Sequence, residues 1–329
     1  MKKRIIGLST CGEKDLSLKG FQLYADNGIG AMEISVSADA HKQLDCAALR
    51  HNAAETGVQL WSYHLPFEPF EANDISSLNE RVRRISIDLQ KGLLEKAAAL
   101  GCRKAVIHPS GEPLDEAERA ARLEQAKKSL SVLAAFAAGA GLQLAVENLP
   151  RTCLGRNAGE ILSLLQADER LGLCFDTNHL LGESTEFFLH RCAGRIVTIH
   201  VSDYDYRNER HWLPGEGKID WPLVACMLET AGYRGPWLYE VGFETPPTIA
   251  RDRALTYADF LRNAGEIFRG EARFRRHCQI CRTGPGRKPA ARRSTAAGQN
   301  SAAPCRRWIY QPQPWNPPGQ SFFIGRNYR

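Results

Sequence analysis

The chain has 329 residues, of which 43% are hydrophobic and 24% are charged, so it can bury a large core as one or two domains. Its net charge of +6 is unevenly distributed, because residues 271–329 contain twelve of the 43 Lys and Arg but only one of the 37 Asp and Glu. Residues 1–270 therefore have a net charge of −5, which argues against a long phosphate-neutralising surface in that part of the chain. No apolar run reaches 18 residues, and the apolar run near the N-terminus has three, so we expect neither a membrane span nor a signal peptide.

Short apolar runs alternate with longer amphipathic segments through residues 3–270. The predicted strands are, in chain order, residues 3–10, 31–36, 58–66, 104–110, 143–150, 171–179, 195–203 and 235–242. Between them, residues 76–101 and 113–141 have apolar residues at intervals of three and four and end on Gly, which is typical of helices. Eight strands alternating with helices predict an α/β fold, a (β/α)8 TIM barrel spanning 1–270. A doubly wound open sheet is the alternative, but GLSTCG (7–12) lacks its usual glycine-rich first turn.

Six of the predicted strands carry, near their C-terminal end, a residue that can bind a metal or exchange a proton. They are His64, His108, Glu147, Asp176, His200 and Glu240. Side chains alternate along a strand, so all six are predicted to point inward at the barrel mouth, where the active sites of this fold lie. One such residue alone is more often structural, or a helix cap, but six together indicate a functional site.

Three of these residues are acids, Glu147, Asp176 and Glu240, and they would repel one another in a barrel mouth unless protons, partners or a cation compensated them. His200 adds a neutral nitrogen ligand. Three carboxylates and one imidazole, without a thiolate, favour one divalent ion, Mn²⁺, Mg²⁺ or Co²⁺, with Zn²⁺ as a further candidate. We therefore predict a metal site made of Glu147, Asp176, His200 and Glu240.

The segments LAVENL, CFDTNH, IHVSD, RHWLPGEGKIDW and LYEVG resemble, in order and spacing, the xylose isomerase-like TIM-barrel superfamily. It includes sugar-phosphate isomerases and epimerases, ketose 3-epimerases and the endonuclease IV type of AP endonuclease. The resemblance covers about residues 1–270 and implies that the four predicted ligands hold one metal, with Glu147 and Glu240 as the catalytic acid/base pair on opposite faces of a sugar. The residues that it places at the substrate are His64, His108, His179, Arg210 and His211.

The function expected from this resemblance is metal-dependent isomerisation or epimerisation of a small sugar, sugar phosphate or related polyol. The reaction would remove a proton beside a carbonyl and pass through an enediolate. One alternative is an endonuclease IV-like AP endonuclease with three zinc ions; nearly all nine ligands have candidates, but Glu209 stands where that family places an Asp. A keto-polyol dehydratase is another alternative, because it also starts with proton removal beside a carbonyl. The complete Glu/Asp/His/Glu set speaks against a relative that only binds.

The segment HWLPGEGKIDW (211–221) is predicted to fold as a loop over the barrel mouth. Gly215 and Gly217 tolerate backbone conformations that other residues resist. Asp220 is predicted to cap the following helix, and Trp221 is interpreted as a packing residue. An ordinary Pro-Gly turn is the simpler interpretation of the same residues.

Residues 271–329 are rich in Arg, Pro, Gly and Ala and have no helical or alternating period, which predicts a disordered, low-complexity basic tail. We expect this tail to be dispensable; it also fits a frameshifted reading of a GC-rich gene end. A nucleic-acid-binding arm is the alternative, because Trp308, Tyr310 and Trp315 lie among its basic residues. The pair Cys278 and Cys281 is a weak signal for zinc.

Ten Cys are scattered through the chain without the spacing of a disulfide framework, which indicates buried, reduced thiols and a cytoplasmic protein. The expected partner is a small-molecule carbohydrate substrate. We do not expect the barrel to bind nucleic acid or the chain to bind a membrane, and a homo-oligomer is left open.

Overall fold

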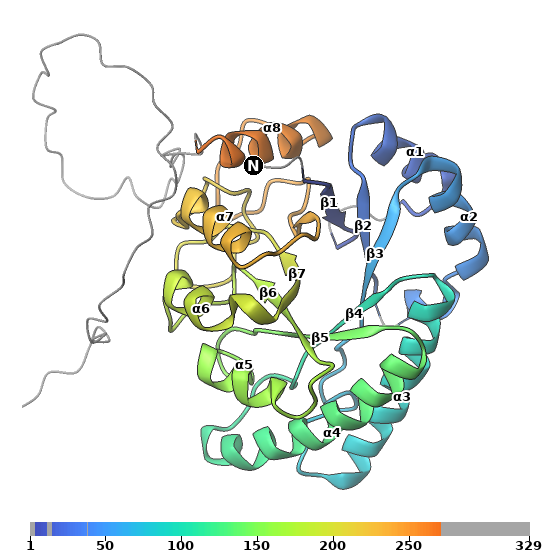
Figure 1. The fold of residues 1–329 in the computed structure, drawn as a ribbon, viewed down its shortest axis with the longest axis vertical. Helices are drawn as coiled ribbons and strands as arrows, with labels where there is room; N and C mark the ends of the chain where they lie inside the picture. The colour runs from blue at the N-terminus through green and yellow to red at the C-terminus, as the bar shows by residue number, and fades with distance from the viewer. Residues whose placement is uncertain (1–3, 12–14, 38, 271–329) are drawn as a thin grey trace, which may run out of the picture. The chain divides into compact units, whose positions relative to one another are not determined.

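The computed structural model describes residues 4–11, 15–37 and 39–270, in which eight strands alternate with eight α-helices (Figure 1). The strands are β1 (Ile6–Ser9), β2 (Ala31–Ser35), β3 (Gln59–His64), β4 (Lys104–Ile107), β5 (Gln143–Glu147), β6 (Gly172–Asp176), β7 (Ile196–His200) and β8 (Trp237–Tyr239). The helices are α1 (Leu18–Asp26), α2 (Cys46–Thr56), α3 (Glu80–Ala99), α4 (Arg119–Gly139), α5 (Ala158–Leu165), α6 (Thr185–Cys192), α7 (Trp221–Thr230) and α8 (Tyr257–Phe268). Each predicted strand contains one observed strand.

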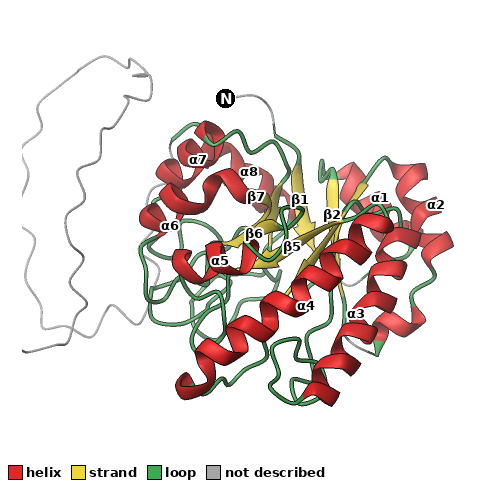
Figure 2. Cartoon of the chain, turned by 60° about the horizontal axis from the view of Figure 1, so that its bottom comes forward, coloured by secondary structure: helices red, strands yellow, loops and turns green. Residues whose placement is uncertain are grey.

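Neighbouring strands pair in parallel in the order β7-β6-β5-β4-β3-β2-β1-β8. The sheet closes between β7 and β8 through Val201, whose N–H donates to Leu238 O at 2.8 Å and whose carbonyl accepts from Glu240 N at 3.1 Å. The helices surround the strands on the outside (Figure 2). The predicted TIM barrel is therefore confirmed, and the carboxyl ends of all eight strands meet at one mouth.

The alternation of side chains along the strands separates two cores. Residues that face outward are buried against the helices, among them Tyr63, Phe175 and Tyr239. A smaller inner cluster under the mouth contains Val106, Ala145 and Cys174, packed with Val197. Inward and outward positions thus alternate, as the period of two along a strand requires.

An irregularity in the strand pairing alters this pattern locally. Between β2 and β3 the register shifts after Met32, so that Trp61 is an extra residue and Glu33 lies opposite Ser62. The Trp61 side chain then donates from Nε1 to Thr198 Oγ1 of β7 at 2.9 Å, on the far side of the barrel.

The last helix, α8, starts with a capping box in which Asp259 Oδ2 accepts from the Thr256 N–H and from Thr256 Oγ1, both at 2.8 Å. Hydrogen bonds from Arg253, followed by those from Thr256 and Arg262, hold the pKa of Asp259 well below its usual range. The folded state therefore favours the ionised carboxylate.

We expect Asp259→Asn to lower the free energy of unfolding by about 1 kcal/mol near pH 7, as loss of a helix cap does. The contribution of a carboxylate with a depressed pKa is full above the pKa of the unfolded chain, about 3.9, and is lost as the pH falls towards the folded-state value. Urea unfolding should show that the difference in free energy of unfolding between Asp259→Asn and wild type is smaller at pH 3 than at pH 7. Asp252→Asn, at an exposed position, is the control; an equal gap at both pH values would contradict the capping role.

The seven cysteines within the described ranges form no disulfide, and four of them are buried. Within the same ranges, every helix is too short or too polar to cross a bilayer. The predicted tail, residues 271–329, lies outside the described residues, and the domain boundary at 270 stays a prediction.

Candidate metal and active site

Four side chains from the ends of four consecutive strands, β5 to β8, converge in the barrel mouth. Glu147, Asp176, His200 and Glu240 each offer a ligand atom, and these atoms lie within 4.8 Å of one another. His200 Nδ1 lies 2.9 Å from Glu147 Oε1, 3.7 Å from Asp176 Oδ2 and 3.4 Å from Glu240 Oε2. The structure thus brings together the predicted quartet.

The electrostatics of this quartet separate its two glutamates. Burial alone would raise the pKa of Glu147, but His200, His108 and His64 hold it well below the usual range. Burial raises the pKa of Glu240 well above its usual range, and the charges of Asp176 and Glu147 add to that rise. The pKa values of the two glutamates are therefore shifted in opposite directions, because histidines surround Glu147 whereas burial and neighbouring acids act on Glu240.

Two further histidines contact the other oxygen of Glu147. His64 Nε2 lies 3.1 Å and His108 Nε2 lies 3.2 Å from Glu147 Oε2. His64 Nδ1 lies 3.1 Å from the carbonyl of Leu65, which can only accept, so Nδ1 carries the proton and Nε2 is the nitrogen turned towards the carboxylate. One glutamate thus links two sets of histidines.

A third group lies at the rim of the mouth. His179 Nε2 is 2.9 Å from Glu209 Oε1, and His211 Nε2 is 4.0 Å from the same oxygen. His179 donates from Nδ1 to the Asn148 carbonyl at 2.9 Å, and His211 donates from Nδ1 to the Glu240 carbonyl at 3.1 Å. Both imidazoles therefore turn Nε2 towards Glu209, as ligand histidines do when a backbone carbonyl fixes their tautomer.

These groups fit a metal ion. A lone pair on a neutral imidazole that faces a carboxylate oxygen at about 3 Å is repelled unless a proton or a cation lies between them. In addition, Asp176 Oδ2 and Glu240 Oε2 are buried polar atoms without a hydrogen-bond partner. A divalent cation coordinated by the quartet would satisfy both oxygens and compensate the three acids.

The loop after β7 is organised by a buried carboxylate, Asp203. Its Oδ2 accepts from the Gly215 N–H at 2.7 Å and from Trp221 Nε1 at 2.8 Å, and its Oδ1 accepts from the N–H groups of Tyr204 and Ile219 at 2.8 and 3.2 Å. Its backbone pairs with Trp212 in an antiparallel bridge. Trp221 is thus fully buried, as predicted for a packing residue, but it also donates a hydrogen bond.

In the loop 211–221, Asp220 and Gly215 have the predicted roles, whereas Gly217 is required for a different reason than predicted. Asp220 caps α7, accepting from the Leu223 N–H at 3.1 Å. Gly215 has a left-handed backbone, with φ of 92°. Gly217 does not; a Cβ there would overlap Asp203 Oδ1 and the backbone of Tyr204, so it is required for space.

Three residues other than Gly have positive φ within the described ranges, and all lie in loops of the mouth: Arg151 (50°), Tyr206 (61°) and His211 (49°). Such conformations cost about 1–3 kcal/mol each and cluster at functional sites. Arg151 holds Glu112 with two hydrogen bonds, of 2.8 and 2.7 Å, and also contacts Glu209. Arg151 therefore connects Glu209, a candidate metal ligand at the rim, to Glu112 in the loop after β4.

The guanidinium of Arg210 is held by its own loop. It donates to Asp205 Oδ2 from Nε at 3.2 Å and from Nη2 at 3.0 Å, and it lies 5.7 Å from the ring centroid of Trp212. The fork of donors predicted to face the substrate is thus engaged by a carboxylate of its own loop. A substrate-binding role for Arg210 stays a prediction.

Comparison with known proteins identifies the family of this barrel. Residues 21–264 match the family described as xylose isomerase-like TIM barrel. The chain belongs to this family. Curated relatives include the protein y4fM of Sinorhizobium fredii, 25% identical over 226 residues (60% of this chain, 70% of the relative). A second is the probable endonuclease 4 of Symbiobacterium thermophilum, 26% identical over 266 residues (73% of this chain, 91% of the relative).

Solved structures share the shape of this xylose isomerase-like barrel at low identity. A D-tagatose 3-epimerase-like protein has a TM-score of 0.69 at 21% sequence identity, over 81% of this chain and 98% of that chain. At this identity the likeness supports the fold. The chemistry of this barrel must therefore be argued from its own side chains.

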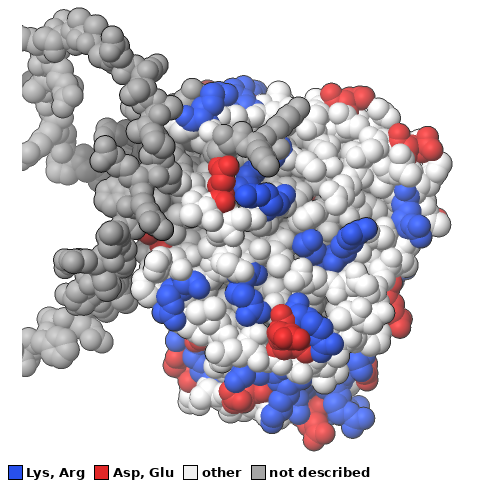
Figure 3. Space-filling model, in the orientation of Figure 1, with Lys and Arg blue, Asp and Glu red and all other residues white. Residues whose placement is uncertain are grey.

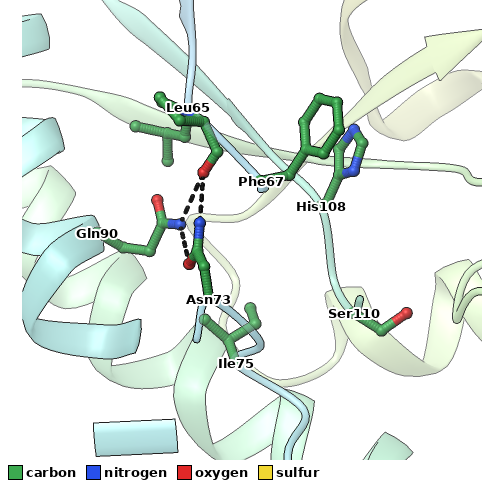
Figure 4. Close-up of a pocket in the computed structure, with 8 residues that line it drawn as sticks. Leu65, Phe67, Asn73, Ile75, Gln90, His108 and Ser110 are labelled. Carbon is green, nitrogen blue, oxygen red and sulfur yellow. Dashed lines mark hydrogen bonds between the residues drawn. The ribbon is translucent and has the colours of Figure 1, made fainter. Parts of the chain in front are cut away.

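A small pocket borders His108 in the xylose isomerase-like barrel (Figure 4). The ring of Phe67 stacks on His108, with centroids 4.2 Å apart and planes 9° apart. The loop that carries Phe67 is held by Asn73 and Gln90, whose amides donate to the Pro66 carbonyl at 2.7 and 3.3 Å. This packing fixes the direction in which His108 meets Glu147.

Some functional candidates were not found from the sequence. Glu33 is fully buried in β2 and contacts His200, and Arg151 and Asp203 organise the rim. The signal for Glu33 was present: an acid stands inside the apolar run AMEIS, on the inward face. Arg151 gave no signal, because its role depends on a left-handed backbone and a partner 58 residues away.

Proposed function

We propose that this chain is a divalent-metal-dependent isomerase or epimerase of a small sugar, sugar phosphate or related polyol. The observation that carries the proposal is the quartet, in which Glu147 of β5 and Glu240 after β8 both approach the same nitrogen of His200, at 2.9 and 3.4 Å. A structurally similar protein is described as D-tagatose 3-epimerase-like, which supports this substrate class.

The proposed chemistry needs two carboxylates close to one reacting carbon. A divalent cation bound by the quartet would hold neighbouring oxygens of the substrate and lower the energy of an enediolate. One of Glu147 and Glu240 removes the proton beside the carbonyl, and the other returns a proton to the opposite face. His64 and His108 fix the direction of the Glu147 carboxylate, and the buried walls of the barrel limit the access of water.

A second function, a three-metal phosphodiesterase, is favoured by the additional histidines. His179, Glu209 and His211 form a separate group able to hold an ion, and His64 and His200 form another with Glu147. The alignment with a probable endonuclease 4 covers 91% of that relative. Against this function stand the acidic composition of residues 1–270 and the face drawn in Figure 3, where basic and acidic side chains are interspersed.

The metal content of the full chain, purified without chelator, separates the two functions. We expect one divalent ion per chain, retained when the rim histidine is removed in His211→Ala and lost in Asp176→Asn. Elemental analysis measures this number, and turnover is measured on ketoses and their phosphates. The double variant Cys278→Ser/Cys281→Ser corrects for any zinc taken up by the tail.

The opposite pattern would favour the phosphodiesterase. It consists of three zinc ions per chain, a lower number in His211→Ala and cleavage of DNA at abasic sites. A chain that takes up no ion after incubation with Mn²⁺, Co²⁺ or Zn²⁺ would contradict both functions.

A further inference from the structure

Glu33 is a carboxylate buried in the interior of the barrel. It lies in β2, is 0% exposed, and accepts from Ser62 Oγ at 2.7 Å. Its two oxygens lie 3.0 and 3.1 Å from His200 Nε2, the nitrogen on the opposite side of the ring from the quartet. A buried carboxylate needs such partners, because an isolated charge inside a protein is costly.

Carboxylates lie on both sides of the His200 ring, with Glu147 Oε1 2.9 Å from Nδ1 and Glu33 at 3.0 and 3.1 Å from Nε2. When a cation in the quartet takes the Nδ1 lone pair, the one remaining proton lies on Nε2, where the Glu33 carboxylate accepts it. Nδ1 is the atom that meets Glu147, Asp176 and Glu240. Without Glu33 the ring would lose both its orientation and its preference for this tautomer.

His200 differs in this respect from three other histidines of the mouth. His64, His179 and His211 each donate from Nδ1 to a backbone carbonyl and turn Nε2 inward. His200 turns Nδ1 inward and donates to a charged group. A carboxylate on the second nitrogen makes an imidazole a stronger ligand than a neutral carbonyl does.

The strand irregularity after Met32 supports this arrangement. Because Trp61 is the extra residue of β3, Ser62 lies directly opposite Glu33 and its hydroxyl reaches the carboxylate. A regular register would place Trp61 there instead. The bulge therefore supplies a hydrogen-bond donor that holds Glu33 in place from the side.

We propose that Glu33 is a positioning residue that holds His200 in the orientation and tautomer required for metal binding, with Ser62 holding Glu33. The inference rests on the proposed function in one respect, that the quartet binds a divalent ion. In this proposal β2 contributes Glu33, a residue that supports the metal site without being a ligand, whereas the ligands come from β5 to β8.

The test compares the metal affinity of the full chain with that of Glu33→Gln, which keeps the size of the side chain and removes its charge. We expect the Kd for Mn²⁺ or Zn²⁺, measured by competition with a chelator, to rise by about 10–100-fold. Ser62→Ala should give a smaller rise. Ser129→Ala, which removes a buried hydroxyl of helix α4, should leave the Kd unchanged.

A second measurement reports on the hydrogen bond itself. In the zinc-loaded wild type, the His200 Nε2 proton should give a slowly exchanging, downfield ¹H signal, which moves upfield in Glu33→Gln. If Glu33→Gln does not fold, as judged by circular dichroism, Ser62→Ala carries both measurements.

Two results would overturn the inference and are distinguishable. An unchanged Kd and an unchanged Nε2 proton in folded Glu33→Gln would overturn the role of Glu33 alone. A wild-type chain that binds no divalent ion would overturn the proposed function together with it.

Discussion

Glu147→Gln is expected to lower turnover by at least about 10³-fold and to remove the bound metal, while the fold stays intact. Glu147 contacts His200 with one oxygen, at 2.9 Å, and His64 and His108 with the other, at 3.1 and 3.2 Å. An amide keeps the shape but has no charge, and it presents N–H donors on one side. The substitution therefore removes the carboxylate that both the acid/base function and the cation site require.

The measurements are kcat on the best ketose substrate and metal atoms per chain, with circular dichroism to confirm folding. Glu116→Gln, in the exposed turn before α4, is the matched control and should behave as wild type. Glu240→Gln should also abolish turnover. Near-normal rates in both Glu147→Gln and Glu240→Gln would rule out the two-carboxylate mechanism.

Gly217→Ala is expected to lower the free energy of unfolding by about 3 kcal/mol and turnover by about 10²-fold. The added Cβ would overlap Asp203 Oδ1 and the backbone of Tyr204, neither of which can move freely. Asp203 is held by four donors, so its displacement would loosen the loop that carries Glu209 and His211. The effect should appear in urea unfolding and in kcat.

Gly182→Ala is the control for this substitution. Its Cβ would meet no atom within 4 Å, and its backbone lies outside the left-handed region. Its stability and rate should stay within about 0.5 kcal/mol and 2-fold of wild type. If Gly217→Ala were equally silent, Asp203 would not be the organiser of the loop.

The quartet could be predicted from the sequence because two simple regularities coincide. Side chains alternate along a strand, and the carboxyl ends of parallel strands in a barrel meet at one mouth. An acid or a histidine that ends an apolar run therefore has a defined place. Glu147, Asp176, His200 and Glu240 all follow this pattern, and the structure brings their ligand atoms within 4.8 Å.

Other parts of the site depend on features that no single run of residues reveals. The link between Glu33 and Ser62 needs the extra residue at Trp61, which changes the register between two strands. The engagement of Arg210 by Asp205 depends on the path of a loop, so a motif that predicted a free guanidinium missed its partner. Both the Glu33–Ser62 contact and the Arg210–Asp205 contact depend on irregular backbone, which the hydrophobic pattern of the sequence does not predict.

The bridge between Asp203 and Trp212 has a consequence for how such a protein can change. Two backbone hydrogen bonds, of 2.7 and 3.0 Å, pin the two ends of the segment 204–211 against each other. Glu209 and His211 lie within that segment, whereas the quartet lies on the barrel itself. We therefore expect the sequence of 204–211 to tolerate substitution while the Asp203–Trp212 bridge keeps the ends of the segment in place. Changes in this segment could then alter which substrate is bound, while the quartet and its chemistry stay the same.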